Sequence, residues 1–251
     1  MPTPAPYDSR FFAGHADGSS RSAAVILADI LPRVQARTVA TAESLGATTL
    51  VGYDGDWVRP AELRSRTIDF RAVDLSKPLT IDRRYDLAMS LEVAEHLPAS
   101  RAASFVADLC AASDVVLFSA AAPMQGGTAH INEAWQSTWV SHFAAHGYRA
   151  LDVVRPRVWD DERVELWYRQ NCLVFVNEAG AARVDAAAWL HASPRPADVI
   201  HPGYWTWKLG KYQSYVERPG WHTWLTITLR MIARGGLFRW KPSRPAYPRH
   251  D

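Results

Sequence analysis

The chain has 251 residues, of which 48% are apolar and 22% are charged, and its formal net charge is +2. These values are ordinary for a soluble globular protein with one large domain, or with a core and an extension, and the charge indicates no particular partner. Two cysteines, Cys110 and Cys172, exclude a disulfide framework, and no apolar run reaches the roughly 18 residues that a membrane span needs.

Both cysteines lie in apolar segments, so we expect buried free thiols, as suits a reducing compartment. Residues 1–6 lack the basic start and the apolar run of a signal peptide, and we therefore expect a cytoplasmic protein. Aromatic residues then anchor an N-terminal arm, and apolar residues recur at helical spacing over 23–31. We expect residues 1–35 to form a helical arm.

Strand-like and helix-like segments alternate through the central region, which predicts a parallel sheet with right-handed crossovers. The predicted strands, in chain order, cover residues 48–53, 67–73, 85–90, 115–119, 150–155 and 170–176. The predicted helices between them cover residues 60–65, 100–112 and 133–146. We expect this core to occupy residues 36–178, with the last two strands forming a terminal antiparallel hairpin.

Acidic residues follow two of these strands. Asp54 ends the first predicted strand and Asp56 lies two residues later, while Asp74 follows the second strand and precedes Leu75. Nucleotide-binding α/β proteins use a carboxylate in such a place to accept hydrogen bonds from ribose hydroxyls. The alternatives are a loop aspartate that caps the next turn, and a turn role for Asp74 beside Ser76.

A polar cluster follows the third predicted strand, where Glu92, Glu95 and His96 lie within five residues. Polar groups at the carboxyl end of a strand lie where open α/β sheets bind ligands. Three such ligands could hold a divalent ion, and the alternatives are a lining for the pocket or structural hydrogen bonds.

A glycine pair, Gly126 and Gly127, follows the fourth predicted strand and leads to His130. His130 is a candidate general base, or a further ligand to an ion at the Glu92–His96 cluster. Three neighbours could shape the acceptor site: Asn132, Glu133 and Trp135. The alternative is a helix N-terminus that is capped by Asn132, with Trp135 in the core.

As an ordered set, these pieces over residues 41–176 resemble the class I S-adenosylmethionine (SAM) dependent methyltransferases, and residues 85–98 resemble the family's motif IV. The resemblance implies a Rossmann-like α/β sheet that is mostly parallel, has an antiparallel terminal hairpin and is flanked by helices. It also implies SAM as the cofactor. The ribose would bind to Asp54 or Asp56, and the adenine would bind to Asp74 and Leu75.

The implied reaction is methyl transfer to a small-molecule acceptor at a hydroxyl oxygen, with His130, Glu92 and His96 as candidate catalytic residues. Two resembled subfamilies, the ubiquinone-pathway O-methyltransferases and the RNA 3′-end 2′-O-methyltransferases, hold a divalent metal such as Mg²⁺ on a Glu-x-x-Glu-His motif. The matching ligands here are Glu92, Glu95 and His96. Other members carry the motif without a metal.

The chain departs from the family at the glycine-rich loop that should follow the first strand. There is no glycine between Gly18 and Gly46, and residues 32–37 are too few for a strand and a loop. Residues 38–46 resemble the helix that normally follows the loop. Close approach of the backbone to the cofactor needs glycine, so an inactive, methyltransferase-like binding or partner protein is the alternative.

A sheet without a first strand would be open at its centre, and we judge that cost too large for a stable protein. The segment 33–40 is therefore a candidate for a makeshift first strand. It would complete the sheet and leave the cofactor loop malformed.

The composition changes after residue 178, and we expect 179–251 to be an aromatic, basic extension. From Thr206 onward there are nine Lys or Arg and two Asp or Glu, and residues 222–233 could form an amphipathic helix. One interpretation is a surface for an anionic lipid or a nucleic acid. The other is a helical extension whose tryptophans pack on the core. We expect no nucleic acid partner, and the oligomeric state stays open.

Overall fold

The computed structural model describes residues 9–34, 49–58, 61, 63, 67–184 and 196–217. The chain divides into two compact units, Met1–His201 and Pro202–Asp251, which are described separately. The predicted helices at 38–46 and 222–233, and four of the six residues of the one at 60–65, lie outside the described residues. In the part of the chain that is described, no helix is long and apolar enough to cross a membrane.

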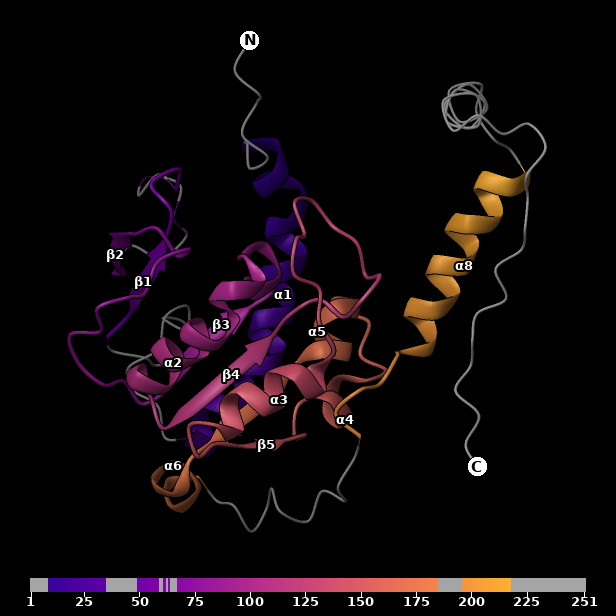
Figure 1. The fold of residues 1–251 in the computed structure, drawn as a ribbon. Coiled ribbons are helices and arrows are strands. Elements are labelled where there is room, and N and C mark those ends of the chain that lie inside the picture. The colour runs from indigo at the N-terminus through magenta and orange to yellow at the C-terminus, as the bar shows by residue number, and fades with distance from the viewer. Residues whose placement is uncertain are drawn as a thin grey trace. The chain divides into compact units, whose positions relative to one another are not determined.

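The first unit is a mixed α/β structure in which helices flank two sheets (Figure 1). Its strands are β1 (Val51–Asp54), β2 (Asp69–Ala72), β3 (Ala88–Leu91), β4 (Val115–Ser119), β5 (Arg149–Leu151) and β6 (Leu173–Val176). Its α-helices are α1 (Ser9–Val34), α2 (Ala102–Ala112), α3 (Gln136–Ala144), α4 (Arg155–Val158), α5 (Leu166–Asn171) and α6 (Glu178–Arg183). Two short 3-10 helices, η3 (Ala94–His96) and η4 (Ala99–Arg101), follow β3.

The strand pairing confirms the predicted α/β class and its antiparallel end. β1 pairs with β2 in parallel, and β3 pairs with β4 in parallel. β6 lies between β4 and β5 and is antiparallel to both, so the second sheet has the order β3-β4-β6-β5. The terminal strands therefore form the expected antiparallel hairpin.

Within the described residues, no strand joins the β1-β2 sheet to β3. Of the candidate makeshift strand 33–40, Arg33 and Val34 form the end of α1, and the remainder lies outside the described residues. One apolar cluster nevertheless includes side chains from both sheets and from α1, among them Leu27 of α1, Leu50 beside β1 and Leu87 beside β3. Burial of these side chains stabilises the two sheets on a common core.

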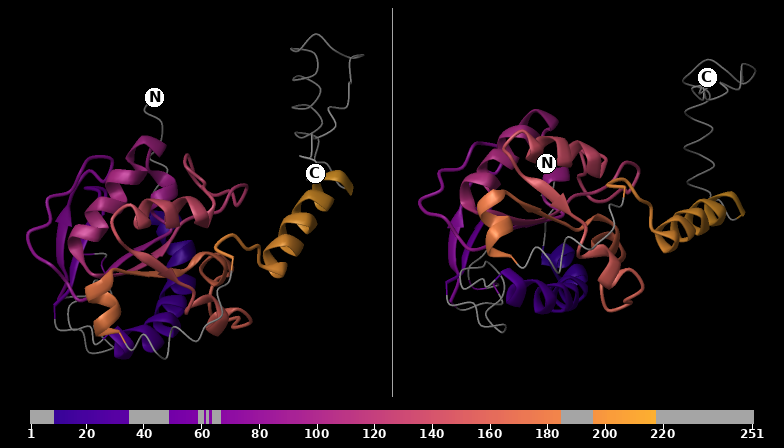
Figure 2. Two further views of the ribbon diagram at one scale, coloured as in Figure 1. Left: turned by 60° about the horizontal axis from the view of Figure 1, so that its bottom comes forward. Right: turned by 90° about the horizontal axis from the view of Figure 1, so that it is seen from below.

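The four-stranded sheet is covered on both faces, and alternate residues of its central strands point to opposite sides. Val115 and Leu117 of β4 belong to the apolar cluster that includes α1, while Val116 and Phe118 belong to the cluster that includes α2 and α3. Figure 2 shows the same layers, with α2 and α3 on one side of the sheet and α1 on the other. All five residues of β4 are buried, and the four before Ser119 are apolar, as is typical of a strand that is covered on both faces.

Two predicted strands are partly helical. The predicted strand 150–155 ends early at Leu151, and α4 begins at Arg155 because Pro156, whose φ angle suits a helix, occupies the first turn. The predicted strand 170–176 begins only at Leu173, because Gln170 and Asn171 complete α5. That last turn of α5 brings Asn171 to the polar cluster after β3.

Candidate functional site

Asp54 is the last residue of β1, at the carboxyl end expected for a ribose ligand. Its Oδ1 atom accepts a hydrogen bond of 2.7 Å from the Gly55 backbone N–H. The side chain is half-buried, and burial raises the pKa of its carboxyl group. Asp56 lies in the following turn and is exposed. Of the two candidates, Asp54 is the one that the fold holds at the strand end.

Asp74 follows β2 and is exposed in a turn, where local groups engage its carboxylate. Oδ1 accepts hydrogen bonds from the Ser76 backbone N–H at 3.0 Å and from the Ser76 hydroxyl at 2.6 Å, while Oδ2 pairs with Lys77 at 3.1 Å. These bonds lower the pKa of Asp74, and the bond from the Ser76 hydroxyl has the largest effect. Leu75 packs against the core, so a role for both residues in adenine binding stays a prediction.

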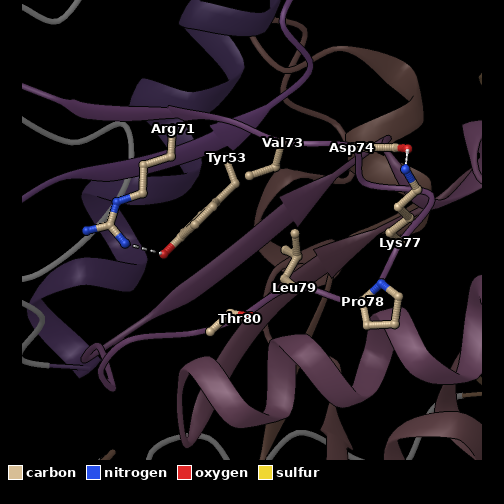
Figure 3. Close-up of a pocket in the computed structure, with 8 residues that line it drawn as sticks. All are labelled: Tyr53, Arg71, Val73, Asp74, Lys77, Pro78, Leu79 and Thr80. Atoms are coloured by element: carbon tan, nitrogen blue, oxygen red, sulfur yellow. Dashed lines mark hydrogen bonds and ion pairs between the residues drawn. The ribbon is translucent and has the colours of Figure 1, made fainter.

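A cavity of about 380 Å³ lies beside the first sheet, lined by Tyr53, Arg71, Val73, Asp74, Lys77, Pro78, Leu79 and Thr80 (Figure 3). In this view the Tyr53 phenol points to the Arg71 guanidinium, which donates to it at 3.1 Å. Burial, followed by the neighbouring Tyr85, raises the pKa of Tyr53 to about 12, so the phenol is neutral near pH 7. The lining includes Asp74 but not Asp54.

Glu92 directly follows β3 and turns its carboxylate toward two side-chain amides. Oε2 accepts from Gln125 Nε2 at 2.9 Å, and Oε1 accepts from Asn171 Nδ2 at 3.2 Å. The Glu92 backbone N–H donates to the Ser119 carbonyl at 3.0 Å, which continues the pairing of β3 with β4. Burial raises the pKa of Glu92, while the bonds to Asn171 and Gln125 act in the opposite direction.

Glu95 is completely buried, and neither of its carboxylate oxygens makes a hydrogen bond of good geometry. Burial, followed by the charge of Glu92, raises the pKa of Glu95 to about 10. With this pKa the group is a neutral carboxylic acid near pH 7, because the transfer of a charge out of water is expensive unless a counter-charge compensates for it, and a bound cation would supply that counter-charge. Glu95 is therefore the group at this site that most needs a ligand.

Two histidines complete the site with Glu95. The His96 and His130 rings meet edge to face, with centroids 4.8 Å apart. One ligand atom from each of Glu95, His96 and His130 lies within 4.8 Å of the others. The structure thus brings His130, which is 35 residues from Glu95 in the chain, to the predicted cluster. The Glu92 carboxylate, in contrast, points to the side-chain amides of Gln125 and Asn171.

The histidine nitrogens are disposed for ligation. His96 Nδ1 lies 3.4 Å from the Ala129 carbonyl oxygen, and His130 Nδ1 lies 3.0 Å from Glu133 Oε1. Since these oxygens only accept hydrogen bonds, each Nδ1 should carry the proton, so a bound ion would be held through Nε2. Burial, followed by the charge of His130, lowers the pKa of His96, so its ring is neutral near pH 7.

The loop that carries His130 is anchored to the Glu95 backbone. The Glu95 carbonyl accepts hydrogen bonds from the backbone N–H groups of Ile131 and Asn132, at 2.9 and 3.0 Å. The Gly126 backbone N–H donates to the Glu133 carboxylate at 2.5 Å, on the oxygen that also meets His130. The loop is therefore held by hydrogen bonds both before and after His130 in the chain, and these bonds fix the position of the His130 ring.

Backbone strain concentrates here. In the described part of the chain, the non-glycine residues with positive φ are Glu92 at 54°, Met124 at 67° and Ala129 at 57°, and all lie at the cluster or on its loop. Such conformations cost about 1 kcal/mol or more each, and they persist where the surroundings impose them, often at functional sites.

Other predictions for the loop have a mixed outcome. Asn132 does not cap the next helix: α3 begins at Gln136, and the Asn132 side-chain amide lies 3.4 Å from the Ala94 carbonyl oxygen. The alternative that placed Trp135 in the core is wrong, since Trp135 is 42% exposed. Glu133 contacts His130, and its role in shaping the acceptor site stays a prediction.

Gln125 and Asn171 are site residues that sequence reasoning missed. Asn171 Nδ2 also donates to Gln125 Oε1 at 2.9 Å, so the two amides and the Glu92 carboxylate form one network. Gln125 and Asn171 lie 46 residues apart in the chain, and neither residue belongs to a motif. The only sequence signal was that both are amides beside otherwise apolar strands.

No protein-family model matches the chain, and no curated protein matches it in sequence. In fold, the chain is similar to the magnesium protoporphyrin IX methyltransferase from Synechocystis with bound SAH, at 14% identity and a TM-score of 0.44. That similarity covers 64% of this chain and 84% of that chain.

It is also similar to the methyltransferase domain of a bacterial Hen1, at 19% identity and a TM-score of 0.45, over 62% of this chain and 97% of that chain. A third similar structure is human N-acetylserotonin methyltransferase in complex with SAM, at 12% identity and a TM-score of 0.42, over 69% of this chain and 60% of that chain.

Proposed function

We propose that the protein is a SAM-dependent methyltransferase that methylates a hydroxyl oxygen of a small-molecule acceptor, with a divalent-ion site at Glu95, His96 and His130. The observation that carries this proposal is the buried Glu95 carboxylate, which lacks a hydrogen bond and faces two histidines after a strand of the sheet. Open α/β sheets bind their ligands at this edge.

The residues present fit a first-row divalent ion such as Mn²⁺ better than Mg²⁺, because Mg²⁺ prefers oxygen ligands and two of these three ligands are imidazoles. One carboxylate and two imidazoles suit first-row divalent ions, and a cation would satisfy the orphaned oxygens of Glu95. Glu133 orients the ligating ring of His130 through Nδ1, as carboxylates do behind many metal-bound histidines. A bound ion would polarise the acceptor hydroxyl and ease its deprotonation.

The protein's own groups have separate roles in this proposal. Methyl transfer from a sulfonium needs mainly alignment of the acceptor with the methyl group. The loop that carries His130 would help to position the acceptor, because it is hydrogen-bonded to the Glu95 carbonyl. His130 serves either as a ligand to the ion or, without an ion, as the group that accepts the acceptor proton, because both roles use the Nε2 lone pair while Glu133 holds Nδ1. Glu92, fixed by Gln125 and Asn171, contributes a positioned carboxyl group beside Glu95.

For the cofactor, we propose that Asp54 binds the ribose, because it ends β1 and keeps a half-buried carboxylate there. Asp56 is the less supported candidate, since its side chain is exposed. Adenine binding at Asp74 and Leu75 would require Asp74 to exchange its bonds with Ser76 and Lys77 for the adenine amino group.

The alternative function is a methyltransferase-like binding or partner protein that no longer binds SAM. A specific observation favours it: within the described residues β1 and β3 are not joined by a strand, and the sequence lacks glycine between Gly18 and Gly46. The backbone that would approach the methionine part of SAM therefore has no counterpart in the sequence pattern.

Calorimetric titration of SAM into the full chain, in a chelator, decides between these functions. Micromolar binding that is weakened at least about tenfold by Asp54→Asn, but not by Asp56→Asn, supports the methyltransferase. No heat at millimolar SAM would contradict it and favour the partner protein. A separate Mn²⁺ titration tests the ion site, with Glu95→Gln as the variant and the exposed Glu162→Gln as its matched control.

A further inference from the structure

The second unit carries a helix with large apolar side chains on its surface. Helix α8 (Pro202–Glu217) exposes Trp205 by 60% and Leu209 by 49%, and because these residues lie four apart they share one helix face. Trp207 is 52% exposed. Lys208 lies over the rings of Tyr204 and Trp207, with Nζ at 5.8 and 5.3 Å from their centroids. Apolar, aromatic and cationic groups are therefore interleaved on this helix.

The charge of the chain is segregated toward this end. From Thr206 onward there are nine Lys or Arg and two Asp or Glu, whereas the preceding residues hold 19 Lys or Arg and 24 Asp or Glu. The total of +2 therefore conceals an acidic first part and a basic last part. Such asymmetry between the parts of a chain indicates an anionic partner for the basic part.

Tryptophan is concentrated in the same region, since five of the 11 tryptophans lie at or after Trp205. Indole rings prefer the boundary between lipid headgroups and acyl chains, where the apolar ring and the polar N–H are both satisfied. Basic residues strengthen such binding about fivefold each near an anionic lipid surface.

From these observations we propose that the second unit binds the surface of an anionic lipid bilayer, with Trp205 and Leu209 inserted among the headgroups and the basic residues facing them. A membrane fits better than a nucleic acid because the side chains that stack on nucleic acid bases are aromatic, whereas Leu209 is aliphatic. Aliphatic side chains do enter the boundary between lipid headgroups and acyl chains. The basic residues also stand singly, and several of them have apolar neighbours, as in interfacial segments.

The test is co-sedimentation of the full chain with vesicles made of phosphatidylcholine and phosphatidylglycerol in equal parts, against vesicles of phosphatidylcholine alone. We expect at least about a hundredfold stronger partition onto the anionic vesicles, with a blue shift of tryptophan emission, and weaker binding as salt is raised. The double variant Trp205→Ser, Leu209→Ser should partition at least about tenfold more weakly.

A matched control is Trp57→Ser, which removes a 50% exposed tryptophan from the first unit and should leave the partition unchanged. Circular dichroism of each variant checks that the fold is intact. Equal partition onto neutral and anionic vesicles, or an unaffected double variant, would overturn the proposal. So would tighter binding to a single-stranded RNA oligomer that the anionic vesicles fail to displace.

Discussion

Replacement of Glu95 by glutamine should change how the stability of the protein depends on pH. In the folded protein burial raises the pKa of Glu95 to about 10, against an ordinary value of 4.5 that applies to the unfolded chain. Since the pKa of Glu95 is higher in the folded protein, its contribution to the free energy of unfolding is fully favourable below about pH 4.5 and is lost as the pH rises toward 10. Each pH unit in this window costs about 1.4 kcal/mol.

Between about pH 4.5 and 7 the wild-type protein should therefore lose about 3 kcal/mol of unfolding free energy through this one group. The Glu95→Gln variant has no carboxyl group at this position and should lose none of it. Its amide adds a constant offset, because a buried amide without partners is itself unfavourable by about 1–3 kcal/mol. The informative quantity is therefore the change with pH in the difference between the two proteins.

Urea unfolding at a series of pH values, in a chelator, measures that difference directly. The exposed Glu162→Gln variant is the control and should run parallel to the wild type. If the Glu95→Gln and wild-type stabilities also run parallel between about pH 4.5 and 7, Glu95 has an ordinary pKa and the reasoning from its burial is refuted. With Mn²⁺ at about 100 times its dissociation constant, the wild type should gain about 2.7 kcal/mol and the variant far less.

Further predictions concern single side chains. Gly127→Ala would place a Cβ 2.2 Å from His130 Nε2, so it should weaken Mn²⁺ binding at least about tenfold in calorimetry. Gly147→Ala, which meets no neighbour, should cost only about 1 kcal/mol in its positive-φ position and bind the ion normally. Arg155→Met should lower the free energy of unfolding by about 3–5 kcal/mol in urea titrations, because Arg155 is 1% exposed and bonds one carboxylate and two carbonyls. Cys172, whose pKa burial raises, should resist iodoacetamide near pH 8 until the chain unfolds, as mass spectrometry would show.

The local features of the site were predictable because their residues are neighbours in the chain. Glu95 and His96 follow a strand within a few residues, so a prediction of the strand also placed them at the edge of the sheet. Asp54 was placed for the same reason. The parallel pairing of β1 with β2 and of β3 with β4 was predictable from the alternation of strands and helices.

The partners of these residues depended on contacts between distant segments. Glu92 was grouped with Glu95 and His96 because the three are adjacent, but its positive φ directs the chain so that its carboxylate meets Gln125 and Asn171 instead. Glycine is the residue that usually signals a positive φ angle, and here the residue is a glutamate. The residue type at this position therefore gave no sign of the unusual torsion. His130 was a candidate ligand, and only the loop folded onto the Glu95 carbonyl decided its place.

The sequence by itself therefore determined the α/β class, the approximate positions of the strands along the chain and the polar groups that follow them, because hydrophobic periodicity and turn residues act over short separations. It also determined the segregation of basic and aromatic residues into the last part of the chain. Only the tertiary structure decided that the described strands form two sheets on a shared apolar cluster, and that the buried Glu95 lies beside two histidines. Both outcomes depend on how distant segments pack, and packing is a property of the whole fold.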